Sequence, residues 1–259
     1  MFARSFIAWS VMLFREQFWS YTYKREFLTA PDGGKVALDW FSEEEEEENH
    51  DDDDDDEKKG PQPDLPEDAP IMLIVSTLAG GPMSYPNCKP LSFFAQKGYR
   101  SVCYVKRGCG IQRPNPYVTA KAWCLLDYED LTMVVAIDHI SKKYPKAKIF
   151  AIGLSTGGGQ IRNYMSRMGG FTKIAAAVAC DAGHAWDRCI VSLDRRLPVI
   201  AQCLARAVAT NYIDFADRNP NHARNAGVDV KRLKSLKNME DLVTTLMAPT
   251  NGYRGKSYE

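Results

Sequence analysis

The sequence predicts an α/β protein built on a mostly parallel, doubly wound sheet with helices on both faces. Its main evidence is a set of four mostly apolar segments, at 71–75, 101–105, 148–152 and 173–179, of which 71–75 is apolar throughout. Runs of this kind suit strands that are buried on both faces. Segments with helical spacing separate them, and such alternation favours parallel strands joined by right-handed crossovers. A chain of 259 residues with 45% hydrophobic residues is long enough to bury one core of this size.

Two strands precede these runs. Residues 27–30 and 35–40 have strand character, and the turn residues Pro31 to Gly34 join them into a hairpin. A short helix over 91–97 is expected to end at Gly98, because glycine suits the position after a helix.

The longest helical pattern begins near Asp127, a candidate N-cap, and ends at Pro145. Apolar residues recur along it at helical spacing, at Met133, Val134, Ile137, Ile140 and Tyr144. Another helix is expected over 160–167. After residue 179 the pattern changes, and residues 186–246 are basic and helical throughout, which predicts a helical cap region.

Acidic residues are concentrated in one segment. Residues 43–48 and 51–57 hold thirteen of the 33 acids, which leaves 20 acidic against 33 basic residues elsewhere. Because such a run repels itself and cannot be buried, we expect residues 43–70, including the following Pro-rich stretch, to form a disordered insert. The basic remainder could favour anionic lipid surfaces, but we expect an ordinary surface balanced by the insert and no nucleic-acid partner.

The N-terminal segment, residues 1–23, is hydrophobic. Its apolar run between Arg4 and Arg15 is too short to span a bilayer as a helix. An interfacial anchor would place the protein on a membrane, at the cytoplasmic face of an internal membrane. Packing of the segment onto the domain, which would leave the protein cytosolic, is an equal alternative.

The cysteines indicate neither disulfides nor a metal site. There are seven, with no CxxC spacing and no Cys/His cluster. We therefore expect free thiols, with Cys103 as a core residue, and no metal or cofactor.

One motif carries chemistry. The strand at 148–152 continues into Gly153-Leu154-Ser155-Thr156-Gly157 and then into a helix. This is the setting of a nucleophile elbow, in which a tight strand-to-helix turn presents a serine hydroxyl. Glycine is expected at 153 and 157 because the turn leaves no room for a Cβ. A phosphate loop is excluded because Gly159-Gln160 stands where Lys-Ser/Thr is needed. A glycine-rich turn with a surface serine is the alternative.

An acyl-transfer serine also needs amide donors for the developing oxyanion. The amide of Thr156, the residue after the nucleophile, is the first candidate. The second is expected from the loop at 76–81, where we select Leu78.

Several short motifs occur in an order that is typical of one known family. They lie at 32–40, 78–85, 98–102, 107–110, 128–131, 144–147, 252–253 and 257–258. With the elbow, they resemble the α/β-hydrolase-fold lipid esterases of the abhydrolase-domain type, in their membrane-anchored branch. The resemblance covers residues 24–259 and implies an α/β-hydrolase fold. It also implies hydrolysis of carboxylic esters of glycerolipids or phospholipids at a membrane, with Ser155 as nucleophile and Thr156 and Leu78 as oxyanion donors.

The sequence departs from that family at two places. Thr77 stands where the family usually has glycine before the oxyanion residue. The family's acid and histidine follow the serine on loops after later strands, and we expect these strands to be absent from a chain that ends at Glu259. The sheet should then end in an unpaired edge, and this chain should be weak or inactive as an enzyme.

Four histidines are present. His50 lies in the acidic insert and His139 on the central helix, so both are poor candidates for a catalytic base. His222 is expected to be solvated in the cap. Asp181 and His184 follow the strand beside the elbow and could approach Ser155, although capping of the next helix is the favoured interpretation.

Three hypotheses follow from the sequence. The first is a serine esterase, lipase or phospholipase that acts through an acyl-enzyme. The second is a catalytically incomplete hydrolase-fold protein that binds lipid or a protein partner. The third is an adaptor for anionic surfaces, favoured by the charge pattern alone.

Overall fold

A six-stranded sheet forms the centre of the molecule. The computed structural model describes residues 22–31, 33–42, 65–77, 81, 85–107, 132–182 and 186–250. The strands lie in the order β1-β2-β4-β3-β5-β6. Their bounds are β1 Thr22–Thr29, β2 Lys35–Ser42, β3 Ile71–Val75, β4 Arg100–Val105, β5 Ile149–Leu154 and β6 Ile174–Cys180.

Most of the sheet is parallel. β4, β3, β5 and β6 pair in parallel, while β1 and β2 form the predicted hairpin and join the sheet antiparallel to β4. The carboxyl ends of the parallel strands therefore share one edge of the sheet. The predicted α/β class and the mostly parallel sheet are confirmed.

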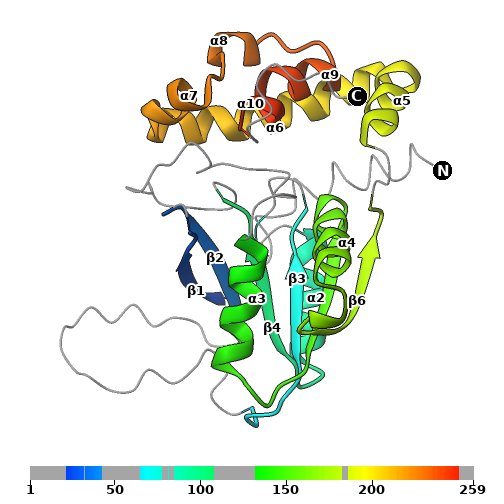
Figure 1. Cartoon of the computed structure of the whole chain (residues 1–259). Coiled ribbons are helices and arrows are strands. Elements are labelled where there is room, and N and C mark those ends of the chain that lie inside the picture. The colour runs from blue at the N-terminus through cyan, green and yellow to red at the C-terminus, as the bar shows by residue number, and fades with distance from the viewer. Residues whose placement is uncertain are drawn as a thin grey trace.

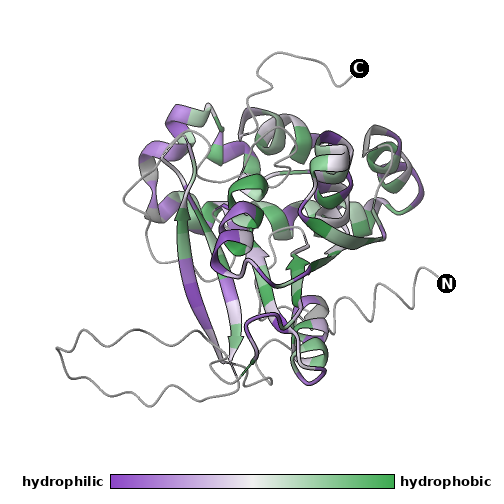
Figure 2. Cartoon of the chain, turned by 60° about the horizontal axis from the view of Figure 1, so that its bottom comes forward, coloured by the Kyte–Doolittle hydropathy of each residue, from purple (hydrophilic) through white to green (hydrophobic). Residues whose placement is uncertain are grey.

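Helices cover both faces of this sheet (Figure 1). α3, Thr132–Lys143, and α4, Thr156–Met168, pack on one face, and α2, Tyr85–Ala95, packs on the other. Residues Met133, Ile137 and Ile140 of α3 are buried there, as their spacing predicted. Figure 2 shows hydrophobic residues along the central strands, with hydrophilic residues on the outer surfaces of the helices.

Element ends follow local chemistry. α3 stops at Lys143, before Pro145. α2 begins earlier than predicted, and the turn after it closes at Gly98, whose φ of 80° suits glycine. α4 begins four residues earlier than predicted, because it starts directly at the elbow. The candidate N-cap Asp127 lies outside the described residues.

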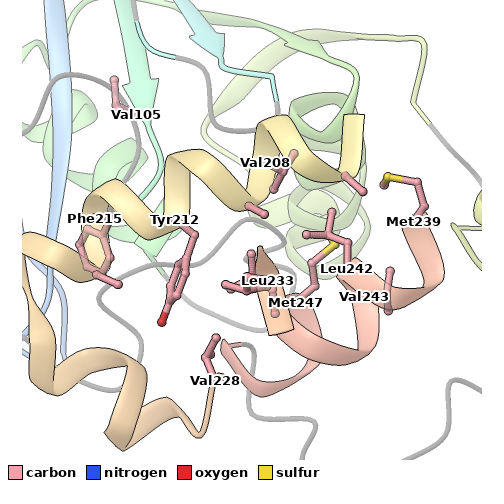
Figure 3. Packing of buried hydrophobic residues seen from close by; sticks show 14 of the residues in the cluster. Val105, Val208, Tyr212, Phe215, Val228, Leu233, Met239, Leu242, Val243 and Met247 are labelled. Carbon is pink, nitrogen blue, oxygen red and sulfur yellow. The ribbon is translucent and has the colours of Figure 1, made fainter. Parts of the chain in front are cut away.

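Residues 186–250 form helices that lie over the carboxyl edge of the sheet (Figure 1). The longest, α6, packs Val208, Tyr212 and Phe215 toward residues of the later helices (Figure 3). The bounds are α5 Trp186–Arg196, α6 Pro198–Arg218, α7 Pro220–Ala226, α8 Val230–Leu233, α9 Met239–Leu242, the π-helix η3 Val243–Met247 and α10 Ala248–Thr250; a short 3-10 helix, η2 Gly169–Phe171, follows α4.

The interpretation of residues 173–179 as a buried strand is wrong. β6 forms as a strand, but it lies at the end of the sheet, and only Ile174 is buried. Within the described residues no strand pairs with its outer edge. The mostly apolar composition of 173–179 indicates a strand and does not say which neighbours cover it. The unpaired edge stays a prediction.

Several predictions fall on residues outside the described ranges. These are the N-terminal segment up to residue 21, the acidic insert from 43 to 64 and the chain after residue 250. In the part that is described, no helix has the length and apolar character needed to cross a membrane.

Candidate active site

Ser155 occupies a strained turn between β5 and α4. Its φ is 53° and its ψ is −115°, a conformation that L-residues rarely adopt. Such a backbone costs about 1–3 kcal/mol and persists only where the surroundings enforce it. The predicted strand, turn and helix are therefore all present around this serine.

Two glycines enforce the turn. A Cβ on Gly153 would lie 2.4 Å from the carbonyl oxygen of Gly157. A Cβ on Gly157 would lie 2.2 Å from the carbonyl oxygen of Val75, at the end of β3. Because real Cβ atoms do not approach backbone this closely, both positions require glycine, as the motif predicted.

The exit of β6 holds the other side of the turn. The amide of Ser155 donates to the carbonyl oxygen of Cys180 at 2.8 Å. A Cβ on Gly158 would lie 2.9 Å from the Cβ of Ala182. The residues after β6 are therefore in contact with the elbow, which was the basis for considering Asp181 and His184.

Asp181 itself is exposed and has a φ of 50°. Its side chain makes no hydrogen bond to Ser155 among the described residues, and His184 lies outside them. Their role as substitutes for an acid and a base stays a prediction.

The candidate oxyanion donors lie on two adjoining segments. Thr156 is the first residue of α4, a position at which a helical amide has no intrahelical partner. The close approach of Gly157 to the carbonyls of Val75 and Ser76 brings the loop after β3 against this helix start. Leu78, the second predicted donor, lies just beyond Thr77, outside the described residues.

A buried lysine joins these two segments. Lys106 directly follows β4, is fully buried, and donates through Nζ to three oxygens. These are the Ser76 carbonyl at 2.8 Å, the Thr77 carbonyl at 3.1 Å and the Thr156 hydroxyl at 2.7 Å. Sequence reasoning missed this residue, although a lysine directly after an apolar strand, at the edge where the elbow opens, was the available signal.

A buried thiol, that of Cys103, lies in the interior near this lysine. Burial raises the pKa of the Cys103 thiol well above its usual range, and nearby Asp39 raises it further, against an opposing effect of Lys106. The thiol is therefore neutral. Cys103 is a core residue, as predicted, and it is free like the other cysteines of the described part, Cys88, Cys180, Cys189 and Cys203.

The described histidines are engaged elsewhere. His139 Nε2 lies 2.8 Å from Glu26 Oε1, between α3 and β1. The prediction that His222 is solvated is wrong, because it is fully buried in the helical layer. Its Nδ1 lies 2.9 Å from the Tyr212 hydroxyl. Burial raises the pKa of the Tyr212 hydroxyl above its usual range.

No group of acidic, histidine or cysteine side chains in the described ranges could hold a metal ion. The arrangement presents Ser155 on a strained turn beside the start of a helix. With the sheet order and the elbow, this defines an α/β-hydrolase-fold protein.

In comparison with known proteins, the chain is similar in sequence to abhydrolase-domain proteins. It is 25% identical to mouse phospholipase ABHD3 over 232 residues, which cover 90% of this chain and 51% of that protein. It is 29% identical over 181 residues to the embryogenesis-associated protein EMB8 of Picea glauca, covering 69% and 34%. An abhydrolase domain-containing protein of Dictyostelium discoideum is 29% identical over 154 residues, covering 56% and 32%. The resemblance inferred from the motifs is confirmed.

The chain spans about half the length of ABHD3 and about a third of the other two relatives. No protein-family model matches it. Among solved structures, the Pyrococcus furiosus esterase Pf2001 aligns at 16% identity with a TM-score of 0.47, covering 78% of this chain and 79% of that one.

Proposed function

We propose that this chain is a serine carboxylic-ester hydrolase, with Ser155 as the nucleophile and with weak activity. The observation that carries the proposal is the strained backbone of Ser155, held between β5 and α4 by Gly153, Gly157 and the carbonyl of Cys180. Similarity to a phospholipase and to abhydrolase-domain proteins supports the same reaction class.

The proposed reaction is acyl transfer. The Ser155 Oγ attacks the ester carbonyl carbon, and the carbonyl oxygen becomes an oxyanion near the amide of Thr156. The bond to the leaving alcohol then breaks, and the proton from Ser155 passes through a base to that alcohol. Water hydrolyses the acyl-serine in a second step, which releases the carboxylic acid and restores the serine.

The base must be a group other than His139 or His222, because their contacts hold them away from Ser155. In this fold a histidine follows the serine and an acid along the chain. The second candidate function is binding of a lipid or a protein partner without turnover, because neither described histidine, His139 or His222, contacts Ser155. We propose a lipid or small-ester ligand for either function, met at a membrane surface.

Labelling with a fluorophosphonate probe separates the two functions. We expect the wild-type chain to be labelled at one serine and Ser155→Ala to lose that label completely. Ser166→Ala is the matched control, because Ser166 is exposed on the same helix, and its labelling should equal that of wild type.

Labelling that persists in Ser155→Ala would contradict the assignment of the nucleophile. A folded wild-type chain that takes up no label would favour the binding function. Slow labelling without ester turnover would mean that the elbow is reactive and the base is lacking, since an oxyanion hole alone supports residual reactivity.

A further inference from the structure

Lys106 is an unusual residue for its position. It is fully buried at the carboxyl end of β4, and a buried ammonium is costly unless its donors are satisfied. Its three N–H donors match three oxygens, at 2.7–3.1 Å, from Ser76, Thr77 and Thr156. Lys106 therefore joins two separate segments of the chain through hydrogen bonds.

Those two segments are the ones that supply the oxyanion donors of the proposed reaction. Ser76 and Thr77 begin the loop after β3, and Thr156 begins α4. Gly157 meets the carbonyl of Val75 with no space for a side chain, so the segments already touch at one point. Lys106 adds a second link, so the start of the loop and the start of α4 are joined at two points.

The charge of the lysine supports the same role. The N-terminus of α4 carries a partial positive charge, which makes a neighbouring cation unfavourable for the stability of the helix. A positive side chain that nonetheless contacts the first helical residue raises the local potential where an oxyanion would form. A positive charge held near a developing oxyanion favours the anionic transition state.

We propose that Lys106 is a positioning residue of the oxyanion hole. It ties the loop after β3 to the start of α4, and its buried charge favours the anionic transition state. The inference rests on the proposed function of Ser155.

The first test is Lys106→Met, which keeps the length of the side chain and removes the ammonium. The fluorophosphonate labelling rate at saturating probe should fall by about 10- to 100-fold, less than the ~100- to 1,000-fold loss on removing an oxyanion donor itself. The probe concentration that gives half the maximal rate should stay within about twofold of the wild-type value, because Lys106 is proposed to stabilise the transition state and not the bound probe. Lys146→Met, at an exposed ion pair with Glu67, is the control and should label as wild type does.

A second variant covers the case in which Lys106→Met does not fold. Thr156→Val keeps the backbone amide and the shape of the side chain but removes the hydroxyl that accepts from Lys106. Its saturating rate should fall by about 3- to 10-fold, while Thr156→Ser, which keeps the hydroxyl, should recover most of it. In the double variant the two losses should not multiply, since both remove the same link.

The outcomes separate the two proposals. Unchanged labelling of Ser155 in a folded Lys106→Met chain would overturn the role of the lysine and leave the function of Ser155 intact. Losses that multiply fully in the double variant would overturn the link through Thr156. A folded wild-type chain without label at Ser155 would overturn the proposed function and this inference with it. A large rate loss with an unchanged melting temperature would support the inference.

Discussion

β5 and β6 are neighbouring parallel strands of similar composition that have opposite environments. Ala151 of β5 pairs in register with Ala177 of β6. Ala151 is 2% exposed and lies in the core beneath α3 and α4, whereas Ala177 is exposed, as are most residues of its strand. The same residue type on adjacent strands therefore has a structural role in one and a solvent-facing role in the other.

The residues that directly follow β5 and β6 extend this comparison. Ser155 and Asp181 are the two non-glycine residues with positive φ in the described part of the chain, and each directly follows one of these strands. Ser155 is held by glycine contacts on both sides and by the carbonyl of Cys180. Asp181 is exposed. Packing therefore enforces the positive φ after β5, and it enforces the positive φ after β6 only weakly.

The largest expected difference concerns Ala151→Asp and Ala177→Asp. A carboxylate at 151 would be buried without a partner in an apolar cluster, so the free energy of unfolding should fall by at least about 3 kcal/mol. At 177 the change should stay within about 1 kcal/mol, since the position is exposed. Urea unfolding followed by circular dichroism measures both. Equal losses would mean that β6 is covered in solution.

A smaller loss is expected for Gly157→Ala. The added Cβ would meet the carbonyl of Val75, which must move, and overpacking of this kind costs about 1–3 kcal/mol. Gly170→Ala is the control, because nothing lies within 4 Å of a Cβ there. Denaturant midpoints compare the two variants, and a stable Gly157→Ala chain with full labelling would contradict the tight elbow.

Relief of strain should give a gain. The positive φ of Ser155 costs about 1–3 kcal/mol of backbone strain, which Ser155→Gly relieves. Glycine also makes the unfolded chain more flexible, which offsets about 0.5–1 kcal/mol of this gain. We expect the free energy of unfolding of Ser155→Gly to be about 1 kcal/mol higher than that of Ser155→Ala, which keeps the Cβ. Asp181→Gly should gain less, because aspartate tolerates this region better. A larger increase in the free energy of unfolding for Asp181→Gly than for Ser155→Gly would contradict the stronger strain at Ser155.

Much of the fold could be predicted because its signals are local. The apolar runs, the spacing along α3 and the glycines of the elbow each depend on nearby residues, so the strands, the helix face and the turn were foreseen. The exposure of β6, the burial of His222 and the contacts of Lys106 were not, because each depends on contacts between segments far apart in sequence. Lys106, for example, contacts residues about 30 and 50 positions away.

The weakest expected effect on stability concerns Val178→Lys on β6. Val178 is 56% exposed on a strand whose outer edge has no partner among the described residues, and such edges favour association between chains. Lysine should change the free energy of unfolding by less than about 0.5 kcal/mol and reduce association in sedimentation velocity. Val199→Lys is the matched control, because Val199 is more exposed but lies on the helix α6. If both variants reduce association equally, exposed apolar area is the cause; if only Val178→Lys does, the open strand edge is.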